Sequence, residues 1–205
     1  MRAFFATVFG LVVTSCLVGC SEDPKPAAKK EAVPPPAPLT GRQAFQYMFG
    51  SARLWAADAQ PLTVRSANLS DVKSEPGKAG AWEVIFASEA MARARTYTWS
   101  ALEAEGFHVG VYPGQQQAWS PGAQVAFSPA LIRIDTPEAL ETATKSAAEY
   151  LAKPGKKPPV NFLLSQERAS RFPNPVWRVM WGSSVSSAEF TVSVDANTGK
   201  ELAHD

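Results

Sequence analysis

The chain has 205 residues, of which 45% are hydrophobic and 19% are charged, and its 20 basic side chains nearly balance its 19 acidic ones. A balanced charge with interspersed signs excludes the electrostatic footprint of a nucleic-acid-binding protein and a polybasic membrane-binding segment. Its only two cysteines, Cys16 and Cys20, lie near the N-terminus, so the folded part has no internal disulfide framework.

Residues 1–19 have the pattern of a secretory signal. Arg2 precedes an apolar run, residues 4–18, that is shorter than the roughly 20 residues of a membrane-spanning helix. The segment Leu17–Cys20 (LVGC) resembles the lipobox of bacterial lipoproteins. That resemblance implies cleavage before Cys20, attachment of diacylglycerol and palmitate-type acyl chains, and anchoring to a membrane of the cell envelope. The alternatives are an ordinary signal peptide with a chance cysteine, or a short anchor.

Ser21 follows the cysteine, a pattern similar to that of lipoproteins sorted to the periplasmic side of the outer membrane. Residues 20–40 then contain six of the 17 prolines and no apolar periodicity. Such a composition cannot form a core, so we expect a disordered or polyproline tether. Extended at ~3.1 Å per residue, it would hold the folded part on the order of 60 Å from the lipid.

Residues 41–60 carry apolar side chains at helical spacing and predict a helix. Thr40 is a suitable N-cap, and Pro61 ends the helix. The apolar face of this helix consists of Phe45, Met48, Ala52, Trp55 and Ala59.

Alternating apolar and polar residues predict three strands after this helix, at 62–72, 81–88 and 96–100. Residues 107–135 are rich in Gly, Pro and Gln and are expected to be a connector, with short strands at 108–112 and 131–134.

The second half repeats this order of elements. Asp135-Thr-Pro-Glu138 is a strong helix start, and the helix should run to about Ala152. A strand is expected at 160–165, followed by a hairpin whose strands centre on Trp177–Trp181 and Phe190–Val194. Asp195–Gly199 closes the second strand with turn-forming residues.

The pattern P-x-W-x-V…F-x-V-x-V-D-A-x-T-G-K, residues 175–200, resembles the C-terminal hairpin of PepSY domains. These small α+β modules occur in the propeptides of thermolysin-type metallopeptidases and in many secreted or membrane-attached bacterial proteins. The resemblance implies a fold with one helix packed on a small antiparallel sheet, and a role in restraining or assisting a secreted peptidase.

Sliding the chain by 95 positions places Trp82 on Trp177 and Val84 on Val179. It also places Leu69-Ser70 on Leu164-Ser165. We therefore predict two PepSY-like modules, residues 41–106 and 136–205, joined by the connector. The first copy is degenerate, because Ser100–Glu103 replaces the D-A-x-T turn and Arg95 stands where the second copy has Phe190. Five tryptophans are expected in the core: Trp55, Trp82, Trp99, Trp177 and Trp181.

No catalytic or metal-binding constellation is visible in the sequence. His108 and His204 are the only histidines, and HExxH, CxxC, P-loop and G-x-S-x-G motifs are absent. Ser70-Asp-Val-Lys73 fits S-x-x-K, but it falls on a predicted strand and lacks a K-T-G companion. We therefore expect no enzyme activity, no cofactor and no metal.

The expected function is binding of an unknown envelope protein or peptide. Arg93 and Arg95 alternate with small residues on the strand 93–99, which would accept an extended peptide as an added strand. Tyr112 and Trp119 lie in the connector and are the aromatics most expected to contact a partner. One alternative is that the two arginines only form a solvated edge that discourages aggregation. Another is a small-ligand or cell-wall-glycan site in a groove between the repeats, marked by aromatic side chains and converging polar groups.

Overall fold

The computed structural model describes residues 37–122, 124–155, 158–166, 168 and 172–204. Residues 1–36, which include the predicted export signal, Cys20 and most of the predicted tether, lie outside the described residues, so the predictions made for them remain predictions. Residues 35–205 form one compact unit.

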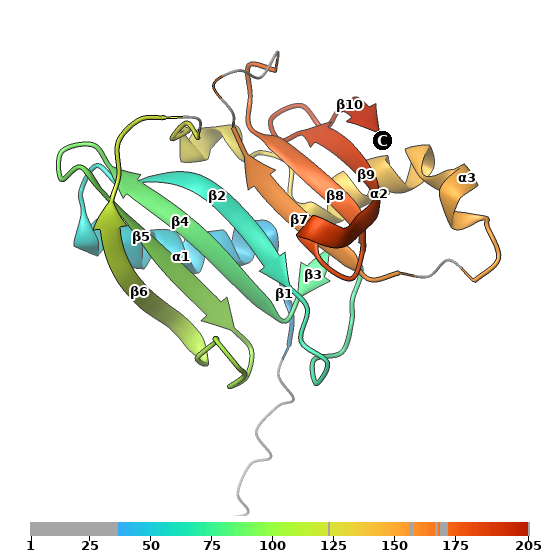
Figure 1. Ribbon diagram of the computed structural model, residues 1–205, viewed down its shortest axis with the longest axis horizontal. Coiled ribbons are helices and arrows are strands. Elements are labelled where there is room, and N and C mark those ends of the chain that lie inside the picture. Colours follow the sequence, from blue (N-terminus) through green and yellow to red (C-terminus); the bar gives the residue numbers. More distant parts are fainter. Residues whose placement is uncertain (1–36, 123, 156–157, 167, 169–171, 205) are drawn as a thin grey trace, which may run out of the picture. The chain divides into compact units, whose positions relative to one another are not determined.

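An antiparallel sheet of eight strands runs through this unit in the order β10-β9-β8-β7-β2-β4-β5-β6 (Figure 1). The strands are β2 (Gln60–Ala67), β4 (Ala81–Ser88), β5 (Arg93–Ser100), β6 (Gly110–Ala118), β7 (Val160–Ser165), β8 (Val176–Gly182), β9 (Ala188–Asp195) and β10 (Glu201–His204). Two short strands, β1 (Leu39–Thr40) and β3 (Lys78–Ala79), form a separate pair. The predicted α+β class with antiparallel strands is confirmed.

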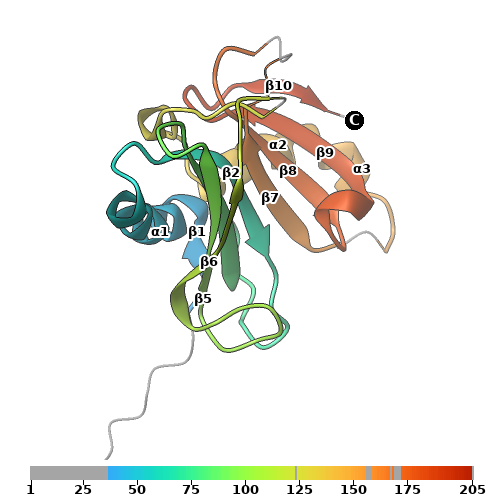
Figure 2. The same cartoon turned by 60° about the vertical axis from the view of Figure 1, so that its left-hand side comes forward.

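The halves of the chain share this sheet. Strands β2 and β7 pair directly, with Val64 opposite Leu164, so the small sheets expected for separate modules are joined edge to edge. Each half contributes four strands instead of the expected three, since β6 and β10 extend the two outer sides. Figure 2 shows β6 beside β5 at one outer edge.

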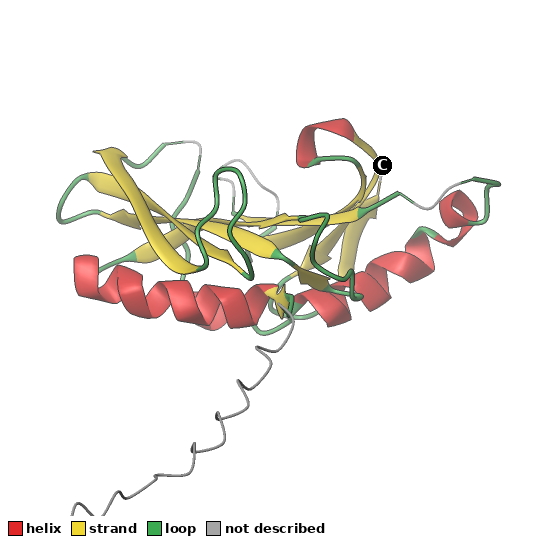
Figure 3. Ribbon diagram, turned by 90° about the horizontal axis from the view of Figure 1, so that it is seen from below, coloured by secondary structure: helices red, strands yellow, loops and turns green. Residues whose placement is uncertain are grey.

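Helices α1 (Gly41–Trp55), α2 (Thr136–Ser146) and α3 (Ala148–Leu151) all lie on one side of the sheet (Figure 3). Thr40 caps α1 in a capping box with Gln43, and Asp135 caps α2 with its carboxylate. Helix α1 ends at Trp55, before the predicted residue 60, because the backbone is already extended at Ala56. Strand β2 begins at Gln60, where Pro61 favours an extended conformation. Short 3-10 helices are η1 (Pro129–Leu131) and η2 (Val185–Ser187).

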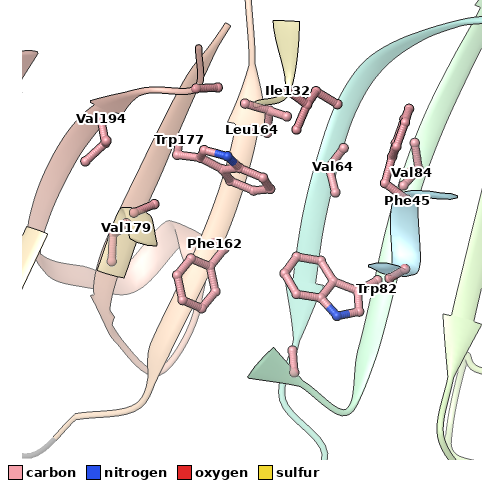
Figure 4. Packing of buried hydrophobic residues seen from close by; sticks show 14 of the residues in the cluster. Phe45, Val64, Trp82, Val84, Ile132, Phe162, Leu164, Trp177, Val179 and Val194 are labelled. Atoms are coloured by element: carbon pink, nitrogen blue, oxygen red, sulfur yellow. The ribbon is translucent and has the colours of Figure 1, made fainter. Parts of the chain in front are cut away.

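The core lies between the helices and the sheet. Trp82 and Trp177 are each 0% exposed and Trp181 is 3% exposed, as predicted. Trp55 and Trp99 are half-buried against the same core. Figure 4 shows the apolar side chains of β7 and β8 beside those of β2 and β4, and all of them belong to one cluster that spans both halves.

The N-termini of α1 and α2 meet where the halves join. The Thr40 hydroxyl donates to Asp135 Oδ2 at 2.5 Å, and the Gly41 amide donates to Thr136 Oγ1 at 2.9 Å. In both contacts the partners are 95 residues apart. The start of α2 therefore satisfies first-turn amides of α1, since the Arg42 amide also donates to Asp135 Oδ1 at 2.8 Å. The Thr40 hydroxyl in turn holds the carboxylate that caps α2.

The two central tryptophans make matched bonds beside this junction. Trp82 Nε1 donates to the Leu39 carbonyl at 3.0 Å, and Trp177 Nε1 donates to the Ile134 carbonyl at 2.9 Å. Both donors lie 43 residues after their acceptors. The indoles consequently hold the segments that lead into α1 and α2.

The predicted alignment of Leu69 with Leu164 is wrong. Ser66 lies opposite Trp82 in the β2–β4 pair, whereas Leu164 lies opposite Trp177 in the β7–β8 pair. Leu164 therefore corresponds to Ser66. Leu69 lies in the loop after β2, which ends at Ala67 instead of the predicted residue 72.

Two predictions for the connector also need correction. The short strand expected at 108–112 is the nine-residue strand β6, which pairs along β5. The strand expected at 131–134 is absent from the described residues. Leu131 ends a 3-10 turn started by Ser128 and Pro129, and Ile134 donates only to the Ala196 carbonyl.

The D-A-N-T-G turn forms as predicted. Asp195 Oδ1 accepts the amides of Asn197 at 2.9 Å and Thr198 at 2.8 Å, and Gly199 adopts a φ of 74°. Burial raises the pKa of Asp195, but hydrogen bonds from Asn174 and from these two amides outweigh that effect, so the pKa is lowered overall.

Candidate functional site

A row of side chains crosses the sheet on the face that carries no α-helix (Figure 3). From β6 to β8 its members are Tyr112, Thr98, Glu83, Arg65, Leu163 and Arg178. Residues directly opposite in antiparallel strands point to the same face. Their chain neighbours Val64, Val84 and Leu164 pack in the core on the helix side. We call the face that carries the row from Tyr112 to Arg178 the helix-free face.

A cleft of about 430 Å³ opens on this face where the halves meet. One wall is the loop after β5, and the other is the serine-rich loop after β8. The lining residues are Arg65, Ser66, Ala67, Asn68, Glu83, Phe107, Asn161, Ser183, Ser184 and Ser186. Most of them are polar, so the cleft suits a ligand that needs hydrogen bonds.

An ion pair forms part of the lining. Arg65 Nη2 donates to Glu83 Oε1 at 2.8 Å, with 49% of the Arg65 side chain and 25% of the Glu83 side chain exposed. Such an exposed pair adds at most about 1 kcal/mol to stability. Both charged groups therefore remain accessible to a ligand.

Two asparagines from different halves meet in the cleft. Asn68 Nδ2 donates to Asn161 Oδ1 at 3.2 Å and to the Val160 carbonyl at 3.0 Å. Asn161 Nδ2 donates to the Gly182 carbonyl at 2.9 Å. Because Asn161 is 5% exposed and bonded at both ends, it is a fixed support for the exposed Asn68 amide.

Serine hydroxyls converge on the opposite wall. Ser184 Oγ lies 2.8 Å from Ser187 Oγ and 3.1 Å from Ser186 Oγ, and Ser183 Oγ also lies 2.8 Å from Ser187 Oγ. A hydroxyl both donates and accepts, so this loop presents adaptable hydrogen-bonding groups to the cleft.

An exposed apolar lip lies beside the cleft. Val109 is 61% exposed and Tyr112 is 47% exposed. The His108 ring rests on Tyr112 with centroids 4.2 Å apart. Glu103 accepts the Val109 amide at 3.2 Å and lies 2.6 Å from His108 Nδ1. The hydrogen bond from the Val109 amide lowers the pKa of Glu103, and the contact with His108 lowers it further. The Glu103 carboxylate therefore links both ends of the loop at residues 103–109.

Arg93 and Arg95 are not brought together with Tyr112. Arg95 lies opposite Phe86 on the helix side of the sheet, where its guanidinium sits 5.5 Å from the Tyr97 ring centroid. Arg95 Nε also donates to the Gly114 carbonyl at 2.8 Å. Its side chain is therefore already engaged.

The prediction that the strand 93–99 accepts an added strand is wrong. β5 pairs with β4 on one side and with β6 on the other. Its backbone groups are therefore already used in the sheet. The prediction failed because Pro113 and Gly114 are typical of loops, so β6 was not expected to pair along β5 and cover its edge.

Trp119 is half-buried instead of fully exposed. It packs on the helix-free face against the small buried cluster of Leu62, Ala87 and Ala94. Its backbone amide donates to the Ala92 carbonyl at 3.1 Å. Among the four residues expected to contact a partner, Tyr112 is the exposed aromatic beside the cleft.

Several cleft residues were not singled out from the sequence. Strand alternation places Arg65 and Glu83 on a polar face, but it cannot tell which strands are neighbours. Asn68 and Asn161 are 93 residues apart and meet only because β2 pairs with β7. The available signal in the sequence was an Asn directly after β2 and another inside the apolar run of β7.

The S-x-x-K sequence lies in the loop between β2 and β3, not on the predicted strand. This loop lines a second cleft of about 820 Å³ with Pro38, Leu140 and Phe162. Ser70 Oγ donates to Asp71 Oδ1 at 3.5 Å. No helix begins at Ser70, which is what that catalytic motif requires.

Ser146, Glu201 and His204 form another polar cluster. The Ser146 hydroxyl donates to Glu201 Oε2, and His204 Nδ1 lies 2.7 Å from Glu201 Oε1. The carboxylate thus separates serine from histidine, whereas a nucleophilic serine needs its base in direct contact. Among the described residues, no three His, Asp, Glu or Cys side chains gather in a way that could hold a metal ion.

The described part of the chain contains no helix with the length and hydrophobicity needed to cross a bilayer. No family model matches the chain, and no curated protein matches it either. The PepSY resemblance therefore rests on the residue pattern alone.

A solved structure shares the fold. It is the crystal structure of a putative lipoprotein from Clostridium difficile 630, with a TM-score of 0.51 and 10% sequence identity. The likeness covers 79% of this chain and 91% of that one. A match of this extent is longer than either half, so the shared fold includes both halves of the sheet.

Proposed function

We propose that the chain is a lipid-anchored cell-envelope protein that binds a protein or peptide segment, without catalysis, on its helix-free face. The observation that carries this proposal is the polar cleft at the junction of the halves, with the exposed lip of Val109 and Tyr112 beside it. Exposed tyrosines next to hydrogen-bonding groups are typical anchors of protein interfaces.

The anchored location is supported by the lipobox-like segment ending at Cys20 and the proline-rich tether that follows. The structural neighbour carries the description of a lipoprotein, which agrees with this location. Ser21 favours the periplasmic side of the outer membrane. The membrane is then reached through the N-terminal lipid.

An extended segment fits the helix-free face better than a compact ligand. The row from Tyr112 to Arg178 crosses the sheet, so a peptide lying along it meets an aromatic ring, the Glu83–Arg65 ion pair and then Leu163 and Arg178. Asn161 lies two residues before Leu163 in the same strand. The Asn68 amide and the serine hydroxyls are suitable partners for peptide backbone groups. By its PepSY-like pattern, the chain would restrain or assist a secreted peptidase.

The absence of catalysis is supported by the described histidines. His108 is held by Glu103 beside the cleft, and His204 is separated from Ser146 by Glu201. The two-module origin of the fold is supported by the matched bonds of Trp82 and Trp177, and its PepSY-like character by the pattern at residues 175–200. Neither proposal needs a cofactor.

Binding of a cell-wall glycan or small ligand is the second candidate. It is favoured by the converging amide and hydroxyl groups of Asn68, Ser184 and Ser186 in the 430 Å³ cleft. Phe107 is the one aromatic residue among those that line it. The expected aromatic lining is therefore only partly present, and we rank this function below peptide binding.

Capture of partners by the purified full chain from solubilised envelope tests the proposal. The double variant Val109→Ser, Tyr112→Ser should capture at least tenfold less partner protein than the parent chain. Met91→Ser is the matched control, because Met91 is a 44% exposed apolar residue on the hairpin between β4 and β5. Equal capture by both variants contradicts the proposal. Competition by protein-free glycan fragments would instead support the second candidate.

A further inference from the structure

The solvent-facing side of α1 is unusual for a surface helix. Leu54 is 91% exposed and Tyr47 is 60% exposed. They lie seven residues apart, so both fall on one stripe of the helix. Gly50 lies between them, and a Cβ placed on it would meet no atom within 4 Å. An open apolar strip therefore runs along the outside of α1.

The charges on this helix have one sign. The sequence of α1 contains Arg42 and Arg53 and no acidic residue. Arg42 Nη1 donates to the Arg133 carbonyl at 3.0 Å and its Nε lies 3.9 Å from Asp135 Oδ2, so Arg53 is the cation that the outer face offers. Arg53 is exposed at the last turn beside Leu54, with its guanidinium 5.9 Å from the Phe49 ring centroid. A helix face that combines arginine, tyrosine and leucine is typical of a segment lying at the surface of an anionic membrane.

Helix α2 lies on the same side of the sheet but has a different outer face. Glu138, Glu141 and Glu149 are in α2 and α3, with Lys145 as the one basic residue of these two helices. The exposed large hydrophobic residues in the described part include none from α2 or α3. The two helices therefore offer contrasting surfaces to anything that approaches the helix side.

We propose that the outer face of α1, formed by Tyr47, Gly50, Arg53 and Leu54, docks on the anionic membrane to which the chain is anchored. This inference rests on the anchored location in the proposed function. Helix α1 begins at residue 41, directly after the proline-rich tether, so it is the first helix that the anchor brings to the lipid.

Tethering makes a weak surface contact effective. The 20 residues between Cys20 and Gly41 keep the folded part within reach of its own membrane, so the contact is intramolecular and a few side chains are sufficient to bias orientation. With the outer face of α1 on the membrane, the helix-free face on the other side of the sheet points away from the lipid. Docking would therefore orient the binding face toward partners.

The test uses the full chain, processed in a bacterial host and reconstituted in phosphatidylethanolamine–phosphatidylglycerol vesicles. A nitroxide is attached at Leu54→Cys, or at the control site Thr144→Cys on α2, which is also exposed. Electron paramagnetic resonance then compares the accessibility of the label to oxygen, which enters lipid, and to a nickel complex, which stays in water.

The oxygen-to-nickel accessibility ratio should be higher at position 54 than at position 144. The difference should shrink when phosphatidylglycerol is omitted. Arg53→Glu should reduce the docked population on the order of tenfold, since each basic residue near an anionic surface contributes about a fivefold preference.

Equal ratios at the two positions overturn docking while leaving the anchor intact. A label at 54 that is immobilised without gaining oxygen accessibility indicates a protein contact or a second copy, and also overturns it. A failed anchor gives a different result from failed docking, because the chain then leaves the vesicles. The parent protein, which has no introduced cysteine, is in that case labelled at an unacylated Cys20. That result defeats the anchored location and this proposal together.

Discussion

Replacing Gly41 by alanine tests the junction of the two halves. A Cβ at this position would lie 2.8 Å from Trp177 Cη2, 2.9 Å from Thr136 Cγ2 and 3.1 Å from Trp82 Cη2. Distances below 3.0 Å require a neighbour to move. Both tryptophans are fully buried and held by indole hydrogen bonds, so neither has space to withdraw.

Two effects of opposite sign decide the outcome. Adding a methyl group to a packed core costs about 1–3 kcal/mol. Alanine is favoured over glycine inside a helix by up to about 1 kcal/mol, and less at the first residue. The clash is the larger effect, so Gly41→Ala should lower the free energy of unfolding by about 1–2 kcal/mol. For a domain of this size that corresponds to a Tm lower by roughly 2–8 °C.

Gly50→Ala in the same helix is the matched control. Its Cβ meets nothing within 4 Å, so only the helix propensity changes and the variant should gain about 0.5–1 kcal/mol. Urea unfolding followed by tryptophan fluorescence measures both variants. A Gly41→Ala protein as stable as the parent, or a destabilised Gly50→Ala protein, would refute the close approach of the helix start and the two indoles.

Substitutions at Thr40, Asp195 and the arginines of β5 test three further contacts. Thr40→Val removes the donor to the buried Asp135 carboxylate and the cap of α1, so it should cost about 1–3 kcal/mol in urea unfolding, whereas Thr40→Ser should retain most of the stability. The lowered pKa of Asp195 contributes stability that is present above its ordinary pKa of 3.8 and is lost as the pH falls through the depressed pKa. Asp195→Asn should therefore flatten the decline of the free energy of unfolding between about pH 5 and pH 2. An unchanged pH profile would contradict the lowered pKa of Asp195. The double variant Arg93→Glu, Arg95→Glu should capture as much partner as the parent chain, because Arg95 lies on the helix side and β5 is not an edge strand. Lost capture by the folded double variant would show that the helix side takes part in binding.

Elements with strong local signals were predictable from the sequence. The start of α2 follows from an Asp cap and an early proline, and β7 has the predicted bounds, 160–165, because its apolar run stands between prolines and a polar segment. The turn at Asp195 follows from its own side chain. Each of these features is decided by residues close together in the chain.

Features that depend on distant pairing were not predictable. Nothing local in β2 indicates that Val64 will lie opposite Leu164, so the continuous sheet and its central cleft were missed. Tyr112 was selected as an exposed aromatic, but Asn68 and Asn161 became site residues only through the β2–β7 pairing. The edge position of β6 was missed because Pro113 and Gly114 are turn residues by composition, although an edge strand tolerates them.

Photo-crosslinking in cells tests most directly whether the helix-free face binds the partner. A benzophenone amino acid is placed at Thr98 or Tyr112 on that face, and at Thr144 on the helix side, in the full chain with its export signal. The account predicts a covalent adduct with a protein or peptide at positions 98 and 112 and none at position 144. An adduct at position 144 alone, or at none of the positions while glycan fragments bind the purified chain, would contradict it.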